Sequence, residues 1–254
     1  MASLNPRDKQ RQAALDDALQ LRMSARFERK LRAEIAGTMR QAADAYEKRG
    51  ELAIPMALSD HSAALRSTLE ADYRYVAGFF GERLLAEAKA HHGPQVVKAS
   101  LTEMLGFSIN SFIGQWTATK VTQINSTTES QIRSLIRFGL DEGFGVDRIA
   151  RTIREAASPM SMLRAHVIAR TETHTAANFG AQTAAELTGL PMKREWVATL
   201  DARTRSDHSS ADGQTRGMRE AFTVGGQKLM YPGDPAGSAS NTIQCRCAVV
   251  FLYE

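Results

Sequence analysis

Apolar residues recur at every fourth position through the first fifty residues, and charged residues fill most positions between them. The series is Leu15, Leu19, Met23, Phe27, Leu31, Ile35 and Met39. This spacing is close to the roughly 3.6 residues of a helical turn, so these side chains share one helix face. The pattern predicts one long amphipathic helix from about Arg11 to Arg49, and Gly50 supplies its end.

The next seventy residues continue the helical pattern with one interruption. Residues 51–60 include Pro55, which cannot continue a helix, so this stretch is predicted to be a connector. Asp60 has the residue type of an N-cap and predicts the start of a second helix that ends at about His92. Residues 95–124 predict a third helix whose core side chains are Phe107, Phe112 and Trp116.

Two short signatures predict later helix starts. Ser126 and Glu129 have the spacing of a capping box, in which each side chain bonds a free backbone N–H of the first turn. Ser158 followed by Pro159 is typical of an N-cap and the first helical position. We therefore expect helices from about 126 to Gly143, from about 147 to 157, and from Ser158 to Gly189.

The last of these helices is rich in alanine and threonine. Small side chains let another backbone approach closely, so we expect this helix to be buried against its neighbours. Arg170, Glu172 and His174 lie along it. Polar residues alternating on a helix point to different faces, and we interpret this set as a structural clamp rather than an acid/base pair.

The periodicity changes after Pro191. Arg194–Leu200 is predicted as a strand with Trp196 facing inward, and Asp212 and Gly213 as a turn. Phe222–Tyr231 predicts a hairpin, residues 232–242 a loop, and the segment from Ile243 a final strand that includes both cysteines.

The predicted fold class is α+β, with a mostly α-helical N-terminal three-quarters and a small, loop-rich, β-containing C-terminal module. We divide the chain into a helical docking arm, residues 1–124, and a module, residues 125–254. The module comprises helices over 126–189 and a small sheet over 190–254.

Charge and composition exclude some classes of protein. The net charge is +4, and the first fifty residues contain eleven Lys and Arg against seven Asp and Glu. This basic segment is consistent with an acidic partner such as duplex DNA and equally with a solvated helix face. The sequence contains no run of eighteen apolar residues and no signal-peptide pattern, so we expect no membrane partner and a protein made in the cytoplasm.

Cys245 and Cys247 are the two cysteines of the chain. Residues two apart on a strand face the same side, so both thiols would project together. A tetrahedral zinc ion needs two more ligands, for which His208 and Asp201 are the first candidates, with Asp207 or Asp212 as alternatives to Asp201. Plain buried thiols are the competing interpretation, because free cysteine is among the most buried residue types.

Enzymatic interpretations have weaker support. A thiol activated by His208 and oriented by Asp201 would suit a hydrolase, but the chain has no glycine-framed nucleophile turn. Arg203 and Arg205 could bind a phosphate or carboxylate together on an extended segment. The chain has no phosphate loop, no dinucleotide fingerprint and no zinc-protease helix motif, so we predict that it is not an enzyme.

The order of these motifs resembles that of the phage Mu F-like minor head proteins, also called head morphogenesis proteins. The similarity covers about residues 125–252. Its elements are IARTE at Ile168–Glu172, Asn178, Trp196, the segment DARTRSDH with Asp201, Arg203, Arg205 and His208, Asp212–Gly213, Phe222, PGDP with Asp234, and CRC at Cys245–Cys247. One departure is Gln244 before Cys245, where the family usually has asparagine.

The resemblance implies a structural protein of a tailed phage or prophage. It would be associated with the portal vertex of the virion head and act in capsid assembly and in DNA packaging or delivery. Expected partners are the portal protein, the major capsid or scaffold protein, and double-stranded DNA. In this interpretation Trp196, Arg203, Arg205, Asp212, Gly213 and Asp234 maintain an interaction module. Because the chain ends at Glu254, we expect no toxin domain after it.

Overall fold

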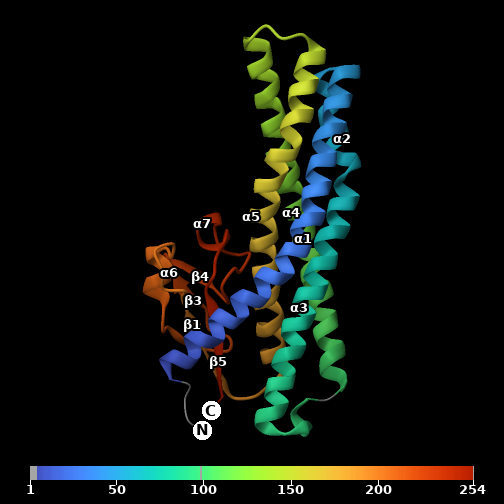
Figure 1. Cartoon of the computed structure of the whole chain (residues 1–254). Coiled ribbons are helices and arrows are strands. Elements are labelled where there is room, and N and C mark those ends of the chain that lie inside the picture. Colours follow the sequence, from blue (N-terminus) through green and yellow to red (C-terminus); the bar gives the residue numbers. More distant parts are fainter. Residues whose placement is uncertain (1–4, 98, 254) are drawn as a thin grey trace. The chain divides into compact units, whose positions relative to one another are not determined.

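The computed structural model describes residues 5–97 and 99–253. Helices make up most of the chain before residue 189 (Figure 1). They are α1 (Pro6–Arg49), α2 (Ile54–Asp60), α3 (Ser62–His92), α4 (Ala99–Asp141) and α5 (Val146–Thr188), with short 3₁₀ turns at Glu51–Ala53 and Pro94–Val96.

Short strands and two short helices follow α5. They are β1 (Met192–Val197), α6 (Ser206–Ala211), β2 (Thr215–Gly217), β3 (Phe222–Val224), β4 (Gln227–Leu229), α7 (Ala239–Thr242) and β5 (Ala248–Tyr253). Strand β1 lies between β2 and β5 in a three-stranded antiparallel sheet, and β3 pairs with β4 as a separate hairpin. The predicted fold class, mostly helical with a small β module near the C-terminus, is confirmed.

The chain divides by its contacts into two compact units. Unit 1 comprises residues 1–24, 72–113 and 170–254, and unit 2 comprises residues 25–71 and 114–169. Each of α1, α3, α4 and α5 therefore contributes residues to both units. The sequence, in contrast, suggests one boundary between residues 124 and 125.

Unit 2 has an apolar core between α1, α2, α4 and α5. Its fully buried members include Met39, Ile54, Ile132 and Ile149. Arg154 of α5 is paired with Asp44 and Glu47 of α1 at the surface of the unit. The predicted apolar face of the first helix is confirmed in this unit, since Phe27, Leu31, Ile35 and Met39 are all buried. Leu15, which was predicted on the same face, is 55% exposed.

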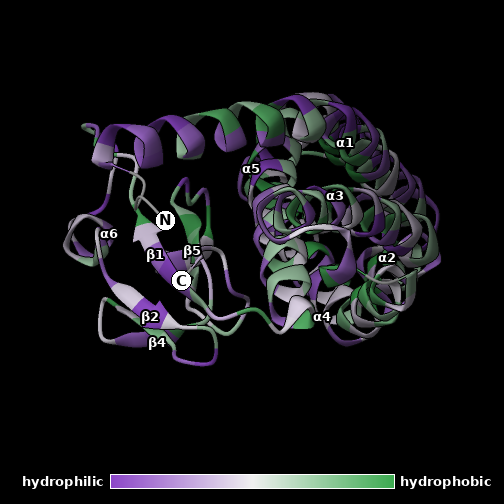
Figure 2. Ribbon diagram, turned by 90° about the horizontal axis from the view of Figure 1, so that it is seen from below, coloured by the Kyte–Doolittle hydropathy of each residue, from purple (hydrophilic) through white to green (hydrophobic). Residues whose placement is uncertain are grey.

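Unit 1 contains the sheet and the helical segments that cover it. Ala13 of α1 packs in a buried cluster with Val197 of β1 and with Ala248 and Val250 of β5. Nearby, Lys9 Nζ lies 2.7 Å from Glu195 Oε2. Figure 2 shows that the first turns of α1 are both hydrophilic and hydrophobic, as expected of a helix with one face on a sheet.

Helices α3 and α5 approach each other closely in unit 1. A side chain on Gly180 of α5 would overlap the backbone carbonyl of Ala77. Ala176, Ala177, Ala184 and Ala185 are buried on the same helix. The expectation that the alanine-rich helix is buried against neighbours is confirmed.

Several predicted boundaries are wrong. Residues 54–60, predicted as a connector, form α2 with Pro55 in its first turn, where the missing N–H would have no helical partner anyway. Asp60 ends α2 and is not the cap of α3. The capping-box residues Ser126 and Glu129 lie inside α4, and Ser158 and Pro159 lie inside α5. In these helices tertiary packing outweighs local cap signals.

Two predictions about side chains also need correction. Phe107 is 75% exposed rather than in the core, whereas Phe112 is buried as predicted. The first strand ends at Val197 and the last begins at Ala248, so Cys245 and Cys247 lie in the loop before β5 and not on the strand. No helix in the described ranges is both long and apolar enough to cross a bilayer.

Candidate functional site

The loop between α7 and β5 directs both cysteines into the interior of unit 1. Gln244 adopts a positive φ of 52°, and its N–H donates to Thr171 Oγ1 at 3.1 Å. Cys245 N donates to Thr242 O at 3.2 Å. This turn buries Cys245 and Cys247 and leaves Arg246 only partly covered. The predicted inward direction of the two thiols is therefore found without a strand.

His208 on α6 meets the two thiols. Its side chain is buried, and its Nδ1 lies 3.3 Å from Cys247 Sγ and 3.6 Å from Cys245 Sγ. The ligand atoms of His208, Cys245 and Cys247 all lie within 4.8 Å of one another. The three residues that the sequence analysis selected from two distant segments thus form one buried cluster.

The two thiols are not equivalent. The hydrogen bond with Cys247 lowers the pKa of Cys245 well below its usual value and outweighs the opposing effect of burial. The same hydrogen bond, together with burial, raises the pKa of Cys247.

His174 of α5 is a further member of this region that the sequence analysis assigned only to a structural clamp. It lies near enough to Cys245 to lower the pKa of that thiol. Its Nδ1 lies 2.8 Å from Gln20 Oε1 of α1, and its side chain is buried. The sequence feature that could have indicated a role for His174 is the group of polar residues Arg170, Glu172 and His174 on α5. Arg170 instead pairs with Asp17, and Glu172 accepts a hydrogen bond from Tyr73.

Asp201, the predicted fourth ligand, lies elsewhere. Its carboxylate forms a two-point ion pair with Arg246, at 2.6 and 2.7 Å, and its Oδ1 accepts the N–H of Arg203 at 2.9 Å. These contacts hold its pKa well below the usual value, chiefly through Arg246. Asp201 is not among the three residues whose ligand atoms gather, and its contacts are those of a turn-forming residue.

The two arginines of the DARTR segment have different surroundings. Arg203 is 80% exposed and lies 3.8 Å from Asp201. Arg205 donates to the carbonyl of Ile243 at 2.5 Å and directly precedes α6. The guanidinium of Arg205 is bonded to a backbone carbonyl and not to a ligand. This geometry therefore does not test whether Arg203 and Arg205 bind one phosphate or carboxylate together.

The remaining motif residues stabilise loops. Trp196 is fully buried, with its ring centroid 6.0 Å from that of His208. Asp212 Oδ1 accepts the N–H of Ala198 at 2.7 Å. Gly213 has a φ of 76°, and its N–H donates to Trp196 O. Asp234 accepts the N–H groups of Met230 and Ala236, at 2.8 and 2.9 Å.

Arg194 is a structural centre that the sequence analysis did not single out. It is fully buried, and its guanidinium donates to Gln182 Oε1 and to the carbonyls of Met230, Gly217 and Glu220. Burial lowers its pKa from the usual value. The sequence did contain a signal that Arg194 is buried. Arg194 lies two positions before the inward-facing Trp196 and therefore on the same face of the strand.

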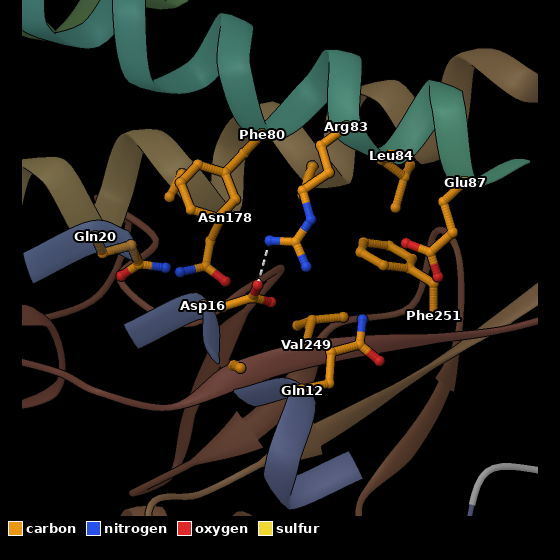
Figure 3. A pocket seen from close by; sticks show the side chains of 13 residues that line it. Gln12, Asp16, Gln20, Phe80, Arg83, Leu84, Glu87, Asn178, Val249 and Phe251 are labelled. Carbon is orange, nitrogen blue, oxygen red and sulfur yellow. Dashed lines mark hydrogen bonds and ion pairs between the residues drawn. The ribbon is translucent and has the colours of Figure 1, made fainter. Parts of the chain in front are cut away.

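A small pocket in unit 1 is bounded by α1, α3, α5 and β5 (Figure 3). Its volume is about 40 Å³, and Arg83 crosses it to Asp16 at 2.5 Å. Burial raises the pKa of Asp16 in spite of this arginine. Pockets for small-molecule ligands are usually on the order of 300–1,000 Å³, so this space suits a few water molecules rather than a substrate.

The polar motif residues of the loop-rich β module thus hold its turns, chiefly through bonds to backbone groups. Residues 130–250, just under half of the chain, match the family model described as Phage Mu protein F like protein. The resemblance noted from the spaced motifs is confirmed.

Two curated proteins are similar to the chain. Minor head protein GP7 of Bacillus phage SPP1 is 26% identical over 245 residues, which cover 87% of this chain and 78% of that protein. NAD(+)--arginine ADP-ribosyltransferase EFV of Enterococcus faecalis is 36% identical over 120 residues, covering 46% of this chain. The match spans only 24% of the length of that transferase. No solved structure matches the chain significantly.

Proposed function

We propose that this chain is a minor head protein of a tailed phage or prophage, located at the portal vertex and acting in capsid assembly and in DNA packaging or delivery. The similarity to a phage minor head protein over 87% of the chain carries this proposal, because it extends well beyond the family match at residues 130–250. The N-terminal helices are thus part of what the two proteins share.

We further propose that the chain is not an enzyme. The transferase activity is named for a protein of which the matching segment is only 24%. In this chain Asp212 and Asp234 accept backbone N–H groups within the β module, those of Ala198 and Met230. Incubation of the purified protein with NAD⁺ and an arginine-containing acceptor should release no nicotinamide above background. Release that depended on this protein would contradict the proposal.

The location is tested by fractionating particles from induced cells and quantifying this chain by mass spectrometry. We expect it to sediment with the portal and major capsid proteins, in low copy, and to form cross-links with the portal protein. Its presence only in the supernatant, while the portal protein sediments, would refute a place in the virion. Capsids with this chain but without cross-links to the portal would refute the vertex assignment alone.

A matched pair of variants connects this location to the folded module. Arg194→Met removes the buried guanidinium that joins four acceptors, whereas Arg203→Met changes an arginine that is 80% exposed. We expect particles to lose the first variant and retain the second. Equal retention would show that the β module is not needed for incorporation.

Duplex DNA is a second candidate partner, supported by the surface of α1. Within unit 2, Arg26, Arg29, Lys30 and Arg40 are exposed. At about 100° per residue, Arg26, Arg29 and Arg40 lie within roughly 60° of one another on the side of the helix opposite Leu31 and Ile35. Acidic residues of α1 are partly neutralised by cations from other helices, such as Asp44 and Glu47 by Arg154.

This candidate predicts an affinity for duplex DNA that falls steeply with salt, because phosphate neutralisation releases counterions. Replacing Arg26, Arg29 and Arg40 together by glutamine should weaken DNA binding. The slope of the salt dependence should also fall, by the amount that corresponds to the loss of about three phosphate contacts. No binding by the parent protein at low salt would exclude it.

A further inference from the structure

The cluster of Cys245, Cys247 and His208 has the spacing of metal ligands. We propose that these three residues, together with His174 as the fourth ligand, bind one structural zinc ion. The proposal concerns the interior of unit 1 and does not depend on the proposed function. It differs from the prediction made from the sequence in its fourth ligand, which is a histidine from α5 and not Asp201.

The distances fit a tetrahedral ion. With Zn–N of about 2.0–2.1 Å and Zn–S of about 2.3 Å, a tetrahedral angle separates a nitrogen and a sulfur ligand by roughly 3.5 Å. His208 Nδ1 lies 3.3 Å from Cys247 Sγ and 3.6 Å from Cys245 Sγ. One ion can therefore contact all three atoms with little movement of these side chains.

The surroundings of His208 also favour a strong interaction at Nδ1. Its Nε2 is buried and has no hydrogen-bond partner among the described residues. A buried polar atom without a partner destabilises the fold, and a weak hydrogen bond between Nδ1 and a thiol offsets little of that cost. Coordination of a dication by Nδ1 would offset more.

His174 has the arrangement of a metal-bound histidine. Gln20 Oε1 lies 2.8 Å from Nδ1 and can accept an N–H there, which puts the lone pair on Nε2. Asn178 Nδ2 lies 3.4 Å from Nε2, so a metal ion at Nε2 would replace this longer contact. Histidine ligands usually donate the other ring N–H to an oxygen in this way, and the bond fixes the ring orientation. His174 lies near enough to Cys245 to lower the pKa of that thiol. It is not one of the three residues whose ligand atoms gather within 4.8 Å, so its ring must move toward them when the ion binds.

Four protein ligands leave no open coordination position, which is the arrangement of structural rather than catalytic zinc. Two thiolates would neutralise the charge of the ion. The ligands come from α5, α6 and the loop before β5, so the ion would join three segments of unit 1 that are far apart in sequence. Zinc would then contribute directly to the stability of the fold.

The first experiment uses the full chain, purified under reducing conditions and then saturated with Zn²⁺ or Co²⁺. We expect one zinc per chain after desalting, thiolate-to-cobalt charge transfer in the near ultraviolet, and the visible bands of tetrahedral Co²⁺. Chelation should lower Tm, and added zinc should restore it. No retained zinc and no charge-transfer band would overturn the proposal, as would an intramolecular disulfide in protein prepared without oxidant.

Variants assign the ligands. Cys247→Ser should weaken zinc binding by about 100-fold or more, and His174→Gln by about 10–100-fold with a shifted cobalt spectrum. The controls are His166→Gln, a histidine whose side chain is 51% exposed, and Asp201→Asn, and neither should change binding. An unchanged cobalt spectrum in His174→Gln would overturn the assignment of His174, and a changed one in Asp201→Asn would restore the aspartate.

Discussion

The buried guanidinium of Arg194 offers the most demanding test of how the β module is held together. It donates to one side-chain oxygen and three backbone carbonyls, and these acceptors belong to α5 and to the segments around β2 and β4. Its charge also lies near Phe222, with Cζ 5.1 Å from the ring centroid. Arg194→Met keeps much of the apolar stem and removes all four donors.

The expected loss follows from opposing contributions. Hydrogen bonds to a charged group contribute about 1.5–3 kcal/mol each, so four bonds give a gross loss of roughly 6–12 kcal/mol. The variant also avoids burying a guanidinium, which costs several kcal/mol. A buried acceptor that loses its donor costs about 1–3 kcal/mol. Because the avoided burial of the guanidinium offsets part of the loss at four acceptors, we expect the free energy of unfolding to fall by about 3–5 kcal/mol.

The assay is urea unfolding followed by tryptophan fluorescence. A Trp116→Phe background leaves Trp196, which is fully buried two residues from Arg194, as the reporter. Arg203→Met in the same background is the control, and a surface substitution of this kind changes stability by about 0.5 kcal/mol or less. If the free energies of unfolding of the two variants differed by less than about 1 kcal/mol, the argument that Arg194 stabilises the β module through its four buried acceptors would be refuted.

Two further predictions concern other parts of unit 1. Gly180→Ala should destabilise the protein by about 1–3 kcal/mol or prevent folding, because its Cβ would overlap the carbonyl of Ala77. Gly78 has open space around it, so Gly78→Ala should be neutral or stabilising by up to about 1 kcal/mol when both variants are compared by thermal unfolding. Equal changes in stability for the two variants would contradict the close contact between α3 and α5. Arg246 lowers the pKa of Asp201 in the folded protein below the unfolded value of 3.8. The carboxylate therefore stabilises the fold at pH values above 3.8, and this stabilisation is lost as the pH falls through the folded pKa. The stability difference between parent and Asp201→Asn should therefore be constant between pH 5 and 7 and shrink below about pH 4, and a difference independent of pH would contradict the ion pair.

The hydrophobic pattern was sufficient to predict the helices but not their boundaries. The buried face of α1 follows directly from the four-residue spacing. Pro55 was predicted to interrupt the helices and Pro159 to begin one, yet Pro55 lies in the first turn of α2 and Pro159 lies inside α5. A single lost hydrogen bond does not end a helix that packs along its length, and this packing is not visible in a local window.

The candidate site shows the same limit. Cys245, Cys247 and His208 could be proposed together because their residue types bind zinc, and the structure brings them within reach. His174 could not be added from spacing, since its approach to Cys245 depends on how α5 packs beside the loop before β5. Asp201 was chosen for its residue type, but the neighbouring Arg246 is its partner.

The contact of Lys9 with Glu195 joins residues 186 positions apart, and Ala13 packs on the same sheet. The family match begins only at residue 130. A fragment cut at that point would keep every recognisable motif but lose the helix that covers Val197 and Val250. Such a fragment should expose apolar surface and aggregate, so the start of the family match is not a position at which the chain can be divided.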